Sequence, residues 1–207
     1  MSVLGFVIAL VSGAQLGLAN PPDRAAWQVD ETLVSLSVPQ GYCANTEAAI
    51  EYDKRQRGRS LPSADLALFR CGESDPQSYD YYTVQTMHQL PKLTLETLFA
   101  RMGESGSSAS VIENASKMRR AIEDWIAGNS VPAFGGGQKI GSDERCIYSV
   151  YIMSAPAGSK VPKVAFFTCT SVVANRVTQF TRFMPVLDVE KAVSALAEVR
   201  NLSLSVK

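Results

Sequence analysis

Histidine is nearly absent from this sequence of 207 residues, which contains His88 alone. A single imidazole excludes a metal site built from several histidines. Any Ser/His/Asp or Cys/His catalytic set has to use this residue, yet the chain lacks the Gly-x-Ser-x-Gly motif that presents a nucleophilic serine. His88 is therefore the basis of one alternative, a hydrolase-type enzyme; otherwise it is a strand-end residue that contacts backbone or water.

An excess of positive charge is absent as well, because 20 basic side chains balance 20 acidic ones. Nucleic-acid-binding proteins normally carry a basic excess, so we expect no nucleic-acid partner. The glycine-rich residues 135–141 lack the Gly-Lys-Ser/Thr ending of a phosphate-binding loop, and no apolar helix follows them. Residues 132–141 are predicted to form a surface loop. The sequence implies no cofactor, and we expect none.

Charged side chains are missing from residues 1–19, and residues 3–18 are almost all apolar or small. Such a run, with small residues at its end, is typical of a signal peptide. It is short for a membrane span of about 20 residues, and no later run is long enough to cross a membrane. We predict a signal peptide at 1–19, a lead-in at 20–30 and a single domain at 31–207. The alternative is an uncleaved membrane anchor.

Four cysteines are present, and none is in C-x-x-C spacing, so the usual patterns of redox catalysis and of a zinc ribbon are missing. An even number in an exported chain predicts two disulfides. Two expected strands contain Cys146 and Cys169, and pairing them antiparallel puts these cysteines opposite each other, near disulfide range. The remaining two cysteines, Cys43 and Cys71, are then expected to form the other disulfide. The alternative is four buried free thiols.

The remaining sequence alternates between strand and helix patterns. Expected strands are residues 33–38, 66–71, 79–87, 146–153 and 164–170, with one more within 172–183. Expected helices are 46–55, 94–102, 111–127 and 189–199, and residues 201–206 trail the last of them. Because the strands pair locally, with helices between and after them, we predict an α+β fold: an antiparallel sheet covered by helices and stapled by Cys43–Cys71 and Cys146–Cys169.

A dense basic cluster follows the first expected helix: Lys54, Arg55, Arg57 and Arg59. Four cations this close suit an acidic partner, a phosphate or an anionic membrane surface. The alternative is a solvated helix end, where cations complement the helix dipole. The acidic pair Asp143-Glu144 is predicted to be solvated at the surface.

The order of elements resembles the Mog1/PsbP-like fold over residues 31–206. Members often begin with a strand that runs into a Pro-x-Gly-aromatic turn, here residues 39–42, and finish with a helix that leads to a short apolar tail, here 202–205. This chain departs from the family in its four cysteines and in the helical stretch 110–127. Members act mostly as binding or assembly accessories, so the resemblance implies a protein without enzymatic activity and assigns no functional residue.

These observations predict an exported accessory or binding protein of the cell envelope, periplasmic or secreted, without catalytic activity. The expected partner is an envelope protein or an anionic ligand, and no membrane span is expected in the mature chain. The alternatives are the hydrolase-type enzyme that uses His88 and a membrane-anchored envelope protein.

Overall fold

Two antiparallel sheets and three helices form the described part of the computed structural model. The described residues are 24–44, 46–58, 64–75, 78–103, 119–120, 123, 138–154, 163–185 and 189–207. The predicted signal peptide, Arg59 and most of the predicted helix at 111–127 lie outside them. None of the described helices has the length and apolar character needed to cross a membrane.

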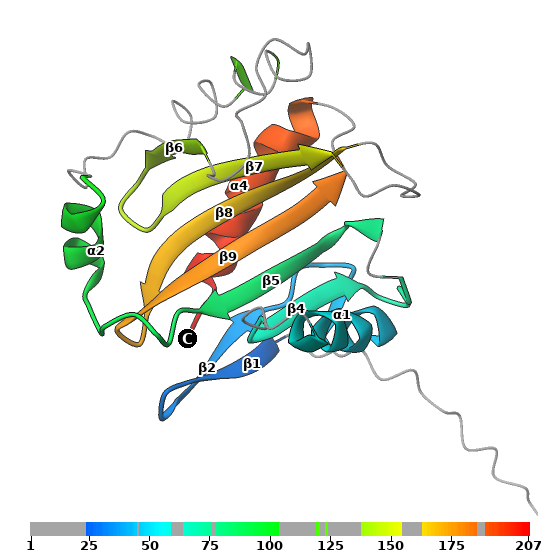
Figure 1. The fold of residues 1–207 in the computed structure, drawn as a ribbon, viewed down its shortest axis with the longest axis horizontal. Coiled ribbons are helices and arrows are strands. Elements are labelled where there is room, and N and C mark those ends of the chain that lie inside the picture. Colours follow the sequence, from blue (N-terminus) through cyan, green and yellow to red (C-terminus); the bar gives the residue numbers. More distant parts are fainter. Residues whose placement is uncertain are drawn as a thin grey trace, which may run out of the picture.

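The larger sheet has seven strands in the order β3-β4-β5-β9-β8-β7-β6 (Figure 1). Their bounds are β3 Tyr42–Ala44, β4 Leu66–Arg70, β5 Tyr81–Thr86, β6 Gln138–Ser142, β7 Ile147–Ser154, β8 Lys163–Val173 and β9 Arg176–Pro185. The smaller sheet is a hairpin of β1 (Arg24–Val29) and β2 (Thr32–Ser37). The helices are α1 (Glu47–Gly58), α2 (Leu95–Arg101) and α4 (Val189–Leu204). The predicted α+β class and antiparallel sheet are confirmed.

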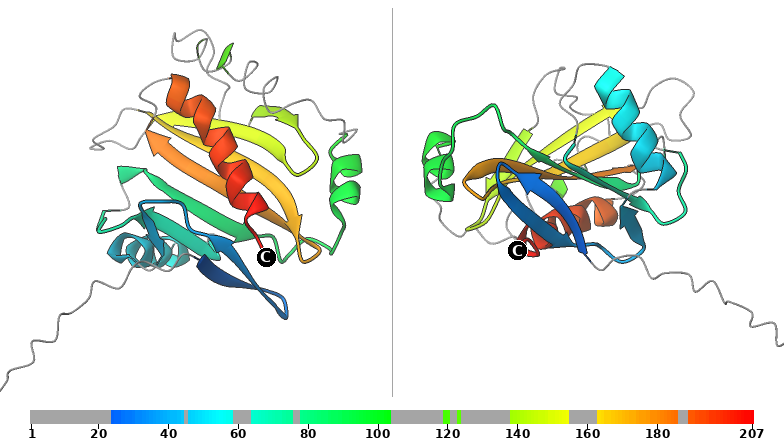
Figure 2. Two further views of the ribbon diagram at one scale, coloured as in Figure 1. Left: turned by 180° about the vertical axis from the view of Figure 1, so that it is seen from behind. Right: turned by 90° about the horizontal axis from the view of Figure 1, so that it is seen from below.

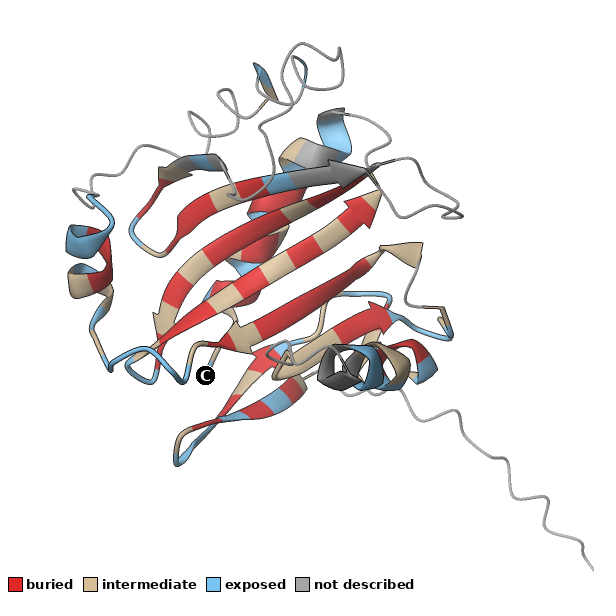
Figure 3. Ribbon diagram, viewed as in Figure 1, coloured by how far each residue is buried: buried red, intermediate tan, exposed pale blue. Residues whose placement is uncertain are grey.

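One face of the seven-stranded sheet, which we call the covered face, packs against α4 and the β1–β2 hairpin (Figure 2). On α4, Ala195, Leu196, Val199 and Leu202 follow the helical spacing that aligns apolar side chains along one stripe. On the strands, alternate residues point to this face, which gives the banded burial along β8 and β9 in Figure 3. The core of the molecule therefore lies between this face and α4.

Both predicted disulfides are confirmed, Cys43–Cys71 and Cys146–Cys169, with Cα–Cα distances of 5.0 and 5.2 Å. The strand register expected for the second is wrong by two residues, because Tyr148 and not Cys146 lies opposite Cys169. Cys146 precedes β7 and accepts a backbone hydrogen bond from Asp143. This turn brings Cys146 to its partner without direct cross-strand opposition.

Three segments differ from their predicted structure. Within the expected lead-in 20–30, strand β1 forms because alternate side chains, Ala25, Trp27 and Val29, are buried in the core. Within the expected loop 132–141, β6 forms as an edge strand paired with β7 across an irregular register. The expected tail 201–206 instead extends α4 to Leu204, and Lys207 then exchanges both backbone hydrogen bonds with Ser35 (3.1 and 2.9 Å).

Candidate functional site

The other face of the seven-stranded sheet, which we call the open face, contains a hollow of about 270 Å³. This face is toward the viewer in Figure 1, where α1 lies at one end of the sheet and α2 at the other. The hollow is lined by side chains from β5, β7, β8 and β9, by Tyr52 of α1 and by Ala64. It is the candidate site because concave surfaces with aromatic and polar groups are where proteins usually hold ligands.

An aromatic row crosses five neighbouring strands of the open face: Phe69, Tyr81, Phe183, Phe166 and Tyr151 are directly opposite one another in register. Ring centroids are 4.5 Å apart for Phe69–Tyr81, 4.4 Å for Tyr81–Phe183 and 4.5 Å for Phe166–Phe183. Such cross-strand aromatic pairs stabilise a sheet. At one end the row meets the disulfide-linked β3–β4 pair, and at the other Tyr151 is 44% exposed.

Polar side chains form the next two rows along the same strands. Thr83, Thr181 and Thr168 are opposite one another, and Gln85, Gln179 and Thr170 follow them. The hydroxyls of Thr168 and Thr181 are 3.1 Å apart, and Gln179 donates to Thr170 at 3.4 Å. None of the described side chains that line the hollow is charged. The candidate site is therefore a neutral floor of hydroxyl and amide groups beside a wall of aromatic rings.

Helix α1 contributes to this site through Tyr52, whose ring centroid lies 5.4 Å from that of Tyr81. The predicted basic cluster begins on the same helix, but neither Lys54 nor Arg55 lines the hollow. Lys54 is exposed, and Arg55 forms an exposed ion pair with Glu51 at 3.0 Å. Exposed pairs of this kind contribute little to stability. The side chain of Arg57 and the whole of Arg59 lie outside the described residues.

His88 lies beyond the end of β5 and does not line the hollow. Its Nδ1 is 3.6 Å from Asp30 Oδ1, and its Nε2 is 3.8 Å from Asp65 Oδ1. Both ring nitrogens therefore face carboxylates. A hydrolase needs the imidazole within hydrogen-bond reach of a nucleophile, and no hydrogen bond joins this ring to a hydroxyl in the part of the chain that the structure describes.

The carboxylate of Asp30 is the centre of an ion cluster at this corner. Its Oδ2 accepts hydrogen bonds from Arg176 Nε at 2.9 Å and lies 3.1 Å from Lys92 Nζ. The hydrogen bond from Arg176, followed by that from Lys92, lowers the pKa of Asp30 from 3.8 to about 2. The cluster links the turn between β1 and β2, where Asp30 has a φ of 51°, to Lys92 and to Arg176 at the start of β9.

This cluster predicts a pH dependence of stability. Because the pKa of Asp30 is lower in the folded than in the unfolded chain, its contribution is present above pH 3.8 and is lost as the pH falls through about 2. We expect Asp30→Asn to reduce the loss of stability over that interval, as measured by urea denaturation at successive pH values. Glu31→Gln removes a neighbouring carboxylate that has no ion pair among the described residues, and it is expected to leave the profile unchanged. If the free energy of unfolding of Asp30→Asn and of the unmodified chain changed with pH in parallel, the role given to Asp30 would be contradicted.

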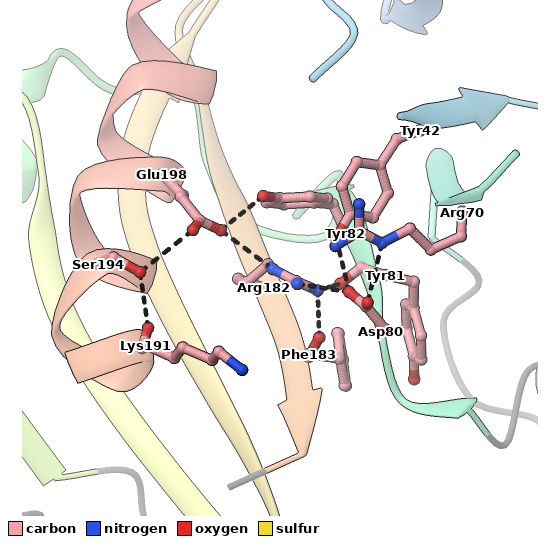
Figure 4. A network of polar contacts seen from close by, with 10 residues as sticks. All are labelled: Tyr42, Arg70, Asp80, Tyr81, Tyr82, Arg182, Phe183, Lys191, Ser194 and Glu198. Carbon is pink, nitrogen blue, oxygen red and sulfur yellow. Dashed lines mark hydrogen bonds and ion pairs between the residues drawn. The ribbon is translucent and has the colours of Figure 1, made fainter. Parts of the chain in front are cut away.

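On the covered face, a buried arginine holds three elements together (Figure 4). Arg182 of β9 is 7% exposed and donates to Asp80 Oδ1 at 2.5 Å and to Glu198 Oε2 of α4 at 3.1 Å. It also donates to the carbonyl oxygens of Tyr81 and Phe183. These bonds satisfy a charge that would otherwise be very costly to bury, so we assign this network a structural role.

Two tyrosines complete the network. Tyr82 donates to Glu198 at 2.7 Å and its ring lies 4.6 Å below the Arg182 guanidinium, while Tyr42 donates to Asp80 at 2.6 Å. Burial alone would raise the pKa of Asp80, but the hydrogen bond from Tyr42 and the charge of Arg182 bring it below its usual value. Burial raises the pKa of both tyrosines, so they remain neutral donors.

Asp143, predicted to be solvated, is instead 2% exposed. Its carboxylate accepts hydrogen bonds from Tyr148 Oη at 2.7 Å, from Arg200 Nε at 2.6 Å and from the backbone N–H of Arg145 and of Cys146 at 2.8 Å each. Burial by itself would raise the pKa of Asp143, and these hydrogen bonds reverse that effect and lower it. The carboxylate therefore fixes the turn that carries Cys146, and only Glu144 of the pair is exposed.

Sequence comparisons find no matching family model and no matching curated protein. Among solved structures, the solution structure of cyanobacterial PsbP (CyanoP) from Synechocystis sp. PCC 6803 aligns with 92% of this chain and 95% of that chain, at 9% identity and a TM-score of 0.37. This similarity supports no conclusion about a family or about the role of any residue.

Proposed function

We propose that this chain is an exported, non-catalytic binding protein of the cell envelope that holds its ligand on the open face of the seven-stranded sheet. The observation that supports the proposal is the hollow between the aromatic row and the polar rows. Two disulfides favour an oxidising compartment, so the proposed location is periplasmic or secreted. The proposed binding site is thus the open face, and the basic cluster is the alternative site that the experiment below tests.

The exposed aromatic ring of Tyr151 makes the proposal testable. Replacing Tyr151 by serine removes one wall of the hollow at a position that is 44% exposed, so the fold is expected to remain intact. We expect the immobilised variant to capture its envelope component at least about tenfold less well than the unmodified chain, a loss of about 1.4 kcal/mol. The measurement is quantitative capture from an envelope extract of the native host.

Leu33→Ser is the matched control, because Leu33 is 70% exposed on the β1–β2 hairpin, which packs on the covered face. It is expected to leave capture unchanged. Equal capture by all the variants would contradict the proposal. Loss of capture in the triple variant Arg55→Ser, Arg57→Ser and Arg59→Ser, with Tyr151→Ser unaffected, would place the site at the basic cluster instead.

A further inference from the structure

We infer that the hollow on the open face binds an uncharged carbohydrate. The inference rests on the proposed function and names the ligand class for that site. The first observation is charge: among the described residues that line the hollow, none carries one. A charged ligand would lose its hydration there without gaining an oppositely charged partner, which is costly. The lining therefore selects a neutral ligand.

The hydroxyl and amide floor determines what kind of neutral ligand fits. Thr83 is 6% exposed and lines the hollow, and its hydroxyl can both donate and accept a hydrogen bond. Thr168 and Thr181 share one hydrogen bond, although each hydroxyl can both donate and accept. The side-chain amide N–H of Gln179 donates to Thr170, and its carbonyl oxygen can accept a hydrogen bond from a ligand. A ligand with several hydroxyl groups matches this mixture of donors and acceptors.

The aromatic wall supplies the other half of a carbohydrate site. Rings of Tyr52, Tyr151, Phe166 and Phe183 line the hollow and are each at least partly exposed. A sugar ring has apolar C–H faces as well as hydroxyl edges, so it can pack a face on an aromatic ring while its edge meets the polar floor. The volume of about 270 Å³ is slightly below that of usual small-molecule sites, about 300–1,000 Å³, and suits a segment of one or two sugar rings.

A neutral peptide is the competing ligand, and the position of the hollow disfavours it. Peptides bound to sheets usually add a strand at a free edge, where backbone groups lack partners. The hollow lies over β5, β9 and β8, which are interior strands paired on both sides. Binding at this site therefore has to use side chains, which is the mode expected for a carbohydrate.

The test is a calorimetric titration of the disulfide-intact full chain with three neutral trisaccharides: chitotriose, cellotriose and maltotriose. We expect saturable binding of at least one, with a Kd between about 1 μM and 1 mM. Gln179→Leu keeps the size of the side chain but removes its amide, and it is expected to weaken binding at least about tenfold, as is Tyr151→Ser. Leu33→Ser is expected to bind like the unmodified chain, and circular dichroism verifies that each variant is folded.

Absence of binding by all three sugars at about 10 mM would overturn the inference. Binding that is unchanged by both Gln179→Leu and Tyr151→Ser would overturn it as well. Saturation by the neutral peptide tetra-alanine, with the sugars inert, would identify a peptide site instead. If the sugars fail while envelope capture still depends on Tyr151, the ligand class is wrong and the proposed binding face stands.

Discussion

Replacing Arg182 by methionine is expected to lower the free energy of unfolding by about 3–5 kcal/mol. The reason is that Arg182 is 7% exposed and is bonded to the carboxylates of Asp80 and Glu198, which the substitution leaves without that partner. Removal of one member of a buried ion pair is more destabilising than removal of the whole pair. Urea denaturation followed by circular dichroism measures the effect.

Arg70→Met is the matched control, because Arg70 bonds the same carboxylate of Asp80 at 2.9 Å but is 49% exposed. It is expected to cost less than about 1 kcal/mol, as exposed ion pairs do. Adding Asp80→Asn to Arg182→Met is expected to recover part of the lost stability, since it removes a carboxylate charge that has lost its buried cationic partner. If Arg182→Met and Arg70→Met lost equal amounts of unfolding free energy, burial of the guanidinium would not explain the effect.

Removing the buried disulfide is expected to have the second largest effect. In the double variant Cys146→Ala with Cys169→Ala, the free energy of unfolding should fall by about 3 kcal/mol, because the cross-link closes a loop of 23 residues in the unfolded chain. Both cysteines are fully buried in the core, so loss of their packing adds to the effect. Urea denaturation at neutral pH measures it.

The second disulfide provides the comparison. Cys43–Cys71 spans 28 residues, but Cys71 is exposed. Under native conditions dithiothreitol is therefore expected to open this bond first, because exchange requires access of the thiolate to a sulfur. Cys146–Cys169 should stay closed until the chain unfolds, as shown by alkylation and mass spectrometry. Simultaneous alkylation of all four cysteines in the folded protein would contradict this order.

Local pattern was enough to predict most of the elements. The expected strands at 33–38 and 66–71 and the expected helices at 46–55 and 94–102 coincide with β2, β4, α1 and α2 to within a few residues. Thr94 caps α2 by accepting from the N–H of Thr97, as its place at the head of an apolar stripe suggests. β1 was missed because it lies beside two prolines and its alternation is weak: Ala26, between the buried Ala25 and Trp27, is apolar although it is exposed.

The buried polar networks were not predictable in this way. The local sequence around Arg182 predicts a strand but not its ion-pair partner, because Asp80 lies 102 residues away along the chain. The sequence offers one sign that Arg182 is buried. Residues 180, 182 and 184 point to the same face of β9, so Arg182 lies between Phe180 and Met184, which are both buried. Asp143 similarly has Arg200 as its partner, 57 residues further along the chain. Pairings this distant depend on how the whole chain folds.

The sequence by itself determined the class of the fold and the positions of most strands and helices, because these follow from periodicity along short segments. It also gave the correct pairing of the four cysteines, because the segments that contain Cys146 and Cys169 were expected to pair, although their register differs by two residues. Only the tertiary structure decided the candidate site. Five aromatic residues between positions 69 and 183 form one row because β5 pairs with β9, which joins the two halves of the chain, and because each hairpin sets its register. A shift of one residue in any of those strands would turn its side chain to the opposite face and break the row.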